Sequence, residues 1–119
     1  MKAEDRDPVD FLNDILDSID KIGSFIEGLD FDEFSEDEKT MYAVTRALEI
    51  IGEATKNLPE SLKKKYSEVP WRKMTGIRDK MIHGYFGIDL EVLWSTINED
   101  IPSVKPLIEK ILGEVEENR

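Results

Sequence analysis

The sequence predicts an all-α protein, an antiparallel bundle of four to five helices. Apolar residues recur at three- and four-residue spacing, and residues that start or stop helices flank these runs. No stretch alternates between apolar and polar residues as a half-buried strand would. A chain of 119 residues is long enough to bury a core, so we expect a single domain over residues 1–119.

The first helix is expected to begin at Asp7-Pro8, because aspartate caps helices and proline is tolerated at the first helical position. Gly28 is expected to end it. The following LDFDEF segment is interpreted as a connector whose aromatic rings enter the core. The apolar stripe of this helix comprises Leu12, Ile15, Leu16, Ile19, Ile22 and Ile26.

The second helix is expected to start at a capping box, with Ser35 at the N-cap and Glu38 three residues later, and to reach about Asn57. Pro59 is expected to open a short third helix and Pro70 a fourth.

The fourth helix is expected to stop at Gly84. Asp89 is a predicted cap for a fifth helix, whose apolar residues include Val92 and Ile97. We expect Pro102 to kink or break this last helix.

Composition excludes several kinds of site. The absence of cysteine excludes disulfides and thiolate metal sites, and a single histidine cannot build an imidazole zinc site within one chain. No apolar run approaches the roughly 20 residues of a membrane helix, and the N-terminus lacks the apolar region of a signal peptide. We therefore expect a cytoplasmic protein with no cofactor and no membrane contact.

Charge is distributed unevenly along the chain. The net charge is −11, yet residues 61–85 carry 7 Lys and Arg against 2 Asp and Glu. An acidic protein repels nucleic acid, whereas a local basic region attracts it. Arg72 and Lys73, in this region, are the predicted RNA-binding residues. The alternative is a solvated helix face.

Asp7, Asp10, Asp14 and Asp17 recur at helical spacing on the first helix. Four carboxylates on one face suggest a divalent metal, but the sequence offers no fixed turn to gather them. A solvated acidic face is the favoured interpretation.

The segment from Gly76 to Asp89 carries the chemistry. It holds the single histidine, His83, with Arg78 five residues before it and Tyr85 two residues after it. Arg78, Lys80 and His83 place three phosphate-binding groups within two helical turns. Since Met74, Ile77 and Met81 mark the core side, Arg78 is expected at its border and His83 nearly opposite.

These residue types can cleave RNA without metal. A histidine with a pKa of about 6.5 transfers protons near neutral pH, and an arginine binds phosphate oxygens and stabilises developing negative charge. His83 would accept the proton of a ribose 2′-hydroxyl, which attacks the adjacent phosphorus while Arg78 stabilises the phosphorane. One histidine leaves the general acid unassigned, and a second chain across a two-fold axis would supply it.

The Arg78-x-x-x-x-His83-x-Tyr85 pattern on a late helix resembles the HEPN domain, and more closely the toxin subunit of HepT–MntA toxin–antitoxin pairs. The resemblance is strong over residues 70–112, with the run GIRDKMIHGYFGIDLEVLWSTINEDIP, and weak in the N-terminal helices.

The resemblance implies a HEPN-like homodimer that acts as a metal-independent ribonuclease, with Arg78 and His83 as the catalytic pair. Asp79 and Lys80 would support them, although Asp79 lowers the local positive charge. The implied partner is an MntA-like antitoxin of the nucleotidyltransferase fold, which transfers AMP onto Tyr85. The alternative for Tyr85 is a ring that packs after the helix end.

A second hypothesis comes from a different class of protein. The chain would be a catalytically silent helical module that docks a nucleotidyltransferase or another protein. The net charge favours this hypothesis, whereas the intact motif favours the nuclease.

Overall fold

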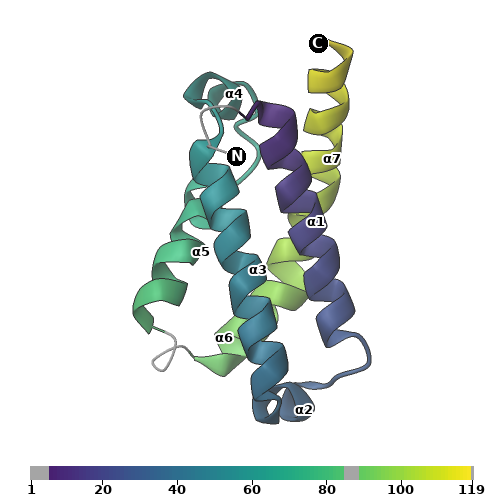
Figure 1. The fold of residues 1–119 in the computed structure, drawn as a ribbon, viewed down its shortest axis with the longest axis vertical. Helices are drawn as coiled ribbons and strands as arrows, with labels where there is room; N and C mark the ends of the chain where they lie inside the picture. Colours follow the sequence, from purple (N-terminus) through teal and green to yellow (C-terminus); the bar gives the residue numbers. More distant parts are fainter. Residues whose placement is uncertain (1–5, 85–88, 119) are drawn as a thin grey trace.

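The computed structural model describes the backbone of residues 6–84 and 89–118 and the side chains of residues 6–77 and 89–118. In these ranges no strand occurs, which confirms the all-α prediction, and no helix is long and apolar enough to cross a membrane. The long helices form an elongated bundle, with shorter helices toward its ends (Figure 1). The long helices are α1 (Pro8–Ile26), α3 (Glu38–Asn57), α5 (Trp71–Gly84) and α7 (Ile101–Glu117); the short ones are α2 (Phe31–Glu36), α4 (Glu60–Lys65) and α6 (Leu90–Ser95).

Aspartate side chains cap several of these helices. Asp7 and Asp89 cap α1 and α6, as predicted from the sequence. Asp30 and Asp37 cap α2 and α3 by accepting hydrogen bonds from backbone N–H groups three residues later. A carboxylate at this position satisfies an otherwise unpaired donor and interacts favourably with the helix dipole. Several of the aspartates of the chain therefore serve helix starts.

The predicted capping box at Ser35 is wrong. Ser35 lies inside α2, where its Oγ donates to the Asp32 carbonyl at 2.8 Å. The N-cap of α3 is Asp37, and the helix begins at Glu38. Most of the LDFDEF segment, from Phe31 onward, is thus helical and not a connector. The reason is tertiary, because the Phe34 ring is completely buried and packs 4.9 Å from the Trp94 ring of α6.

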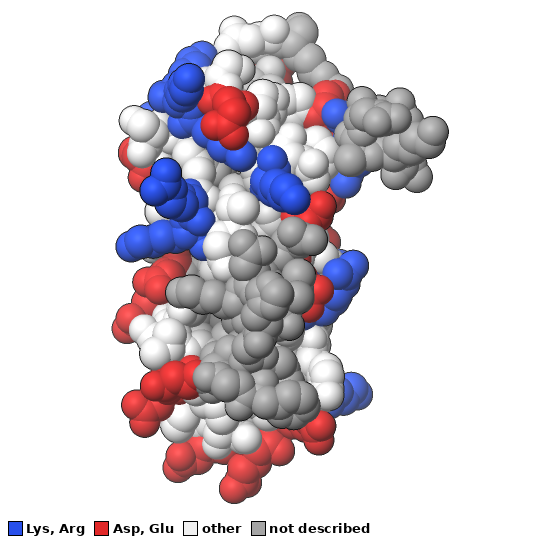
Figure 2. Space-filling model, turned by 90° about the vertical axis from the view of Figure 1, so that its left-hand side faces the viewer, with Lys and Arg blue, Asp and Glu red and all other residues white. Residues whose placement is uncertain are grey.

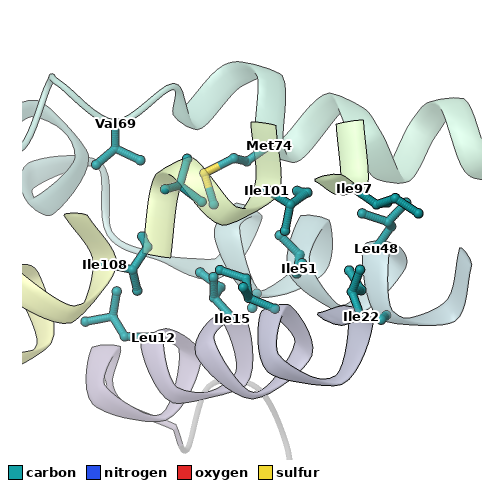
Figure 3. Packing of buried hydrophobic residues seen from close by; sticks show 14 of the residues in the cluster. Leu12, Ile15, Ile22, Leu48, Ile51, Val69, Met74, Ile97, Ile101 and Ile108 are labelled. Atoms are coloured by element: carbon teal, nitrogen blue, oxygen red, sulfur yellow. The ribbon is translucent and has the colours of Figure 1, made fainter. Parts of the chain in front are cut away.

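The hydrophobic core lies where α1, α3 and α7 meet, and α5 packs on the other side of α3. Leu12 and Ile15 of α1 meet Ile51 of α3 and Ile108 of α7, all completely buried (Figure 3). Met74 extends the core toward α5. The apolar stripes predicted from the sequence are thus the buried faces of these helices.

The helix that contains Pro102 does not break. Between α6 and α7 the chain forms a π-helical turn, η3 (Thr96–Asp100), in which the Ile101 N–H donates to the Thr96 carbonyl five residues back. Proline lacks an N–H and its ring clashes with the carbonyl four residues earlier in an α-helix. A wider π turn directly before Pro102 accommodates this change without interrupting the helix.

Replacement of Leu48 by alanine tests the packing of α3. Leu48 is completely buried, so Leu48→Ala should lower the free energy of unfolding by about 2–5 kcal/mol through lost burial and a residual cavity. Urea denaturation measures this change. Val92→Ala is the control: the Val92 side chain, one of the apolar residues expected along its helix, is 59% exposed, so its loss should change stability by less than about 0.5 kcal/mol. Equal effects of the two substitutions would contradict this packing.

Candidate functional site

The motif of the sequence lies at the end of α5. The backbone at positions 78 and 83 belongs to this helix, which packs along α3 and ends at Gly84. The side chains of Arg78, Asp79, Lys80 and His83 lie outside the described residues, as does Tyr85. Their predicted roles therefore stay predictions, and the described part of the site is the first half of α5 with its neighbours.

Trp71, the first residue of α5, joins this helix to α4. Its ring is buried, and its Nε1–H donates to the carbonyl oxygens of Lys63 at 3.1 Å and Tyr66 at 3.0 Å. Carbonyls at the C-terminal end of a helix have no partner within the helix. The indole thus caps α4 and holds its lysines beside the first turn of α5.

An open groove of about 630 Å³ lies at this junction. Its basic side chains come from three helices: Lys56 from α3, Lys63 and Lys64 from α4, and Arg72 from α5. Glu60, Trp71, Thr75 and Gly76 complete the lining. We call this surface the α4–α5 groove.

The groove lies within a larger basic area. On the α5 side of the molecule, lysine and arginine gather over the upper half, around α4 and the start of α5, and acidic side chains surround the lower end (Figure 2). The basic region predicted over residues 61–85 is therefore a basic surface in its described part.

The two predicted RNA-binding residues differ in position. Arg72 lines the α4–α5 groove, whereas Lys73 is exposed and does not line it. Lys56 was missed by the sequence analysis. It is the penultimate residue of α3, outside the basic run, and it reaches the groove because α3 and α5 pack side by side. No local sequence signal could have identified it.

Tyr66 anchors the other side of α4. Its hydroxyl donates a hydrogen bond to Glu114 Oε2 of α7 at 2.5 Å, and the side chain is buried. This bond to a carboxylate raises the pKa of Tyr66 to about 12, since the protonated phenol is the form that donates. The residue directly after α4 is thus held by α7 as well as by α5.

The aspartate row of α1 is engaged in helix capping and ion pairs. Asp7 and Asp10 form the capping box of α1, and Asp14 pairs with Arg6 at 2.7 Å. Asp17 forms an ion pair with the lysine one turn later. Wherever side chains are described, no group of three histidine, cysteine or acidic residues is placed to hold a metal ion.

Comparison with known proteins identifies the family. A family model described as "Ribonuclease HepT-like" matches residues 15–111. The chain belongs to the HepT-like ribonuclease family. Membership places it among the ribonucleases, as the resemblance of its motif predicted. No solved structure matches it.

Relatives in this family match most of the chain. A protein of Thermococcus cleftensis named "Probable ribonuclease HepT" is 51% identical over 89% of this chain and 96% of its own length. A protein of Methanocaldococcus jannaschii, named as a candidate RNase, is 43% identical over 94% of this chain and 97% of its own. A candidate RNase of Caldanaerobacter subterraneus is 39% identical over 90% and 96%.

Tyr66→Phe tests the anchor of α4. Because folding raises the pKa of Tyr66 from about 10 to about 12, the contribution of the bond to stability is complete below pH 10 and is lost as the pH rises from 10 to 12. The variant should therefore melt at a lower temperature than the wild type near neutral pH, and the difference should close toward pH 12.

Thermal melts at several pH values measure this difference, and ultraviolet titration of the phenol measures the pKa. Glu114→Gln keeps an acceptor but removes the charge, so the pKa of Tyr66 should move back toward 10. A melting difference that stays constant over the whole pH range would contradict the role of this bond.

Proposed function

We propose that this protein is an endoribonuclease that cleaves RNA by attack of a ribose 2′-hydroxyl on the adjacent phosphodiester. His83 accepts the proton of the hydroxyl, and Arg78 stabilises the negative charge of the phosphorane. Membership of the HepT-like ribonuclease family carries this proposal. The basic groove on the same helix supports it, because a nuclease must attract a polyanion to an otherwise acidic protein.

The proposed reaction needs no metal, since RNA carries its own nucleophile and the two side chains supply proton transfer and charge stabilisation. Lys80 adds positive charge beside Arg78, and Asp79 orients one of the pair. The carboxylates of α1, the alternative site for a metal-dependent enzyme, are engaged in capping and ion pairs.

A homodimer completes the proposed site. One histidine per chain provides a base but no separate group to protonate the leaving 5′-oxygen. Two-fold symmetry would bring a second copy of the motif to the same cleft and supply that acid.

A nucleotidyltransferase-fold antitoxin of the MntA type is the proposed regulator. Transfer of AMP onto Tyr85 would place a phosphate group beside Arg78. The phosphate would form an ion pair with the guanidinium and repel the phosphates of RNA. The resemblance of the motif to HepT–MntA pairs is the basis of this part of the proposal.

Cleavage of RNA in the presence of EDTA tests the mechanism. The purified protein should cleave an RNA oligomer in chelator and leave its 2′-deoxy counterpart intact. His83→Ala should slow cleavage by about 10²–10⁴-fold, the usual contribution of a general base, and Arg78→Ala should have a comparable effect while circular dichroism stays unchanged. Gel analysis of the products measures the rates.

Three outcomes would contradict the proposal. Activity that disappears with EDTA would indicate a metal enzyme, and full activity of His83→Ala would indicate another site or a contaminating nuclease. A folded protein that binds its partner but cleaves no RNA would support the silent docking module.

A further inference from the structure

The geometry points to the α4–α5 groove as a phosphate-binding subsite that holds the RNA strand several nucleotides away from the bond that is cut. This inference rests on the proposed function and adds a substrate class to it: a single strand long enough to span the groove and the motif together. The groove, its charge and the register of α5 each support it.

Positive charge in the groove is largely available for a ligand. No ion pair joins Lys56, Lys64 or Arg72 to any other residue that the structure describes. Lys63 lies 3.6 Å from Glu60, whose side chain is 81% exposed. The Lys63 side chain is only 12% exposed and is partly neutralised by Glu60, so the charge available to a ligand comes mainly from the other three cations of the groove. Cations that lack internal partners are suited to bind phosphate oxygens.

The first turn of α5 adds to this potential. It contains no acidic residue, whereas aspartates cap α1, α2, α3 and α6. The N-terminal end of a helix carries partial positive charge. Here that charge adds to the charge of the lysines and Arg72, and no carboxylate of the first turn cancels it.

The backbone register of α5 aligns the groove with the motif. Positions 72, 76, 79 and 83 are spaced by four, three and four residues, so they follow one face of the helix. Arg72 and Gly76 line the groove at one end of this face. Position 83 lies about 16 Å beyond position 72 along the helix axis, since a helix rises about 1.5 Å per residue. This distance equals about five stacked nucleotides at about 3.4 Å each.

Gly76 leaves open space beside the helix backbone where the groove meets this face. A Cβ atom added at this position would meet no atom within 4 Å. A strand can therefore pass close to the helix backbone here, and a larger side chain can be introduced without a clash in the fold.

Binding of a single-stranded DNA oligomer of about ten nucleotides tests the groove independently of cleavage. DNA carries the phosphates that the groove is proposed to bind, and it lacks the 2′-hydroxyl that attacks the phosphorus. Lys64→Ala should weaken binding about 5-fold at 0.1 M salt and reduce the slope of log K against log salt by about 0.7, the value for one phosphate contact on a single strand. Fluorescence anisotropy measures both. The matched control is Lys65→Ala, the neighbouring exposed lysine of α4 that does not line the groove, and it should leave the slope unchanged.

Substitution of Gly76 gives a second test. Gly76→Glu places a carboxylate in the path and should weaken binding at least as much as Lys64→Ala. Gly113→Glu adds the same charge on α7, where a Cβ also meets open space, and should have little effect. Gly76→Ala separates helix propensity from charge and should bind normally.

Cleavage of RNA oligomers of decreasing length completes the test. Rates should fall when fewer than about five nucleotides remain on the side of the cut that reaches the groove. The wild type could cleave RNA while Lys64→Ala and Lys65→Ala bind the DNA oligomer with equal affinity, or while short and long RNA oligomers are cut at one rate. Either result would contradict the proposed subsite and leave the proposed ribonuclease activity intact. If the groove variants behave as expected but no RNA is cut, the proposed function fails and the phosphate-binding surface remains.

Discussion

The indole N–H of Trp71, shared between two carbonyl oxygens at the end of α4, is the interaction on which the candidate site depends. α4 has six residues and buries none of them, and a helix of this length is unstable in isolation. The residues on its C-terminal side set its position: Tyr66 and Val69 enter the core, and Trp71 returns to cap its last carbonyls. Without these contacts, the lysines of α4 would have no fixed position relative to Arg72.

The acidic net charge and the basic groove are compatible because they occupy different parts of the molecule. Aspartates are used at helix starts and in ion pairs such as Asp20 with Lys105, which joins α1 to α7. The screening length in physiological salt is about 8 Å, much shorter than the 45 Å length of the molecule. A phosphate at the groove therefore interacts mainly with the local cations, and the net charge of −11 is a poor guide to what this surface binds.

Helices with long apolar stripes could be located from the sequence, and those whose start depends on another helix could not. The apolar stripes of α1 and α3 can be recognised from the spacing of apolar residues alone, since a helix in a bundle must bury one face. At the start of α3, both Ser35 and Asp37 are good capping residues, and local sequence does not separate them. Burial of Phe34 against Trp94 places the preceding segment in α2 and leaves Asp37 to cap α3.

The sequence by itself determined the helical class, the approximate positions of the long helices, and a motif specific enough to indicate its family, because each of these depends on residues close together in the chain. The tertiary structure alone decided which cations share a surface. Lys56 and Arg72 are 16 positions apart, and they line one groove because α3 and α5 pack together and Trp71 fixes α4 between their ends. Packing contacts between distant segments set that arrangement, and no pattern within either segment encodes it.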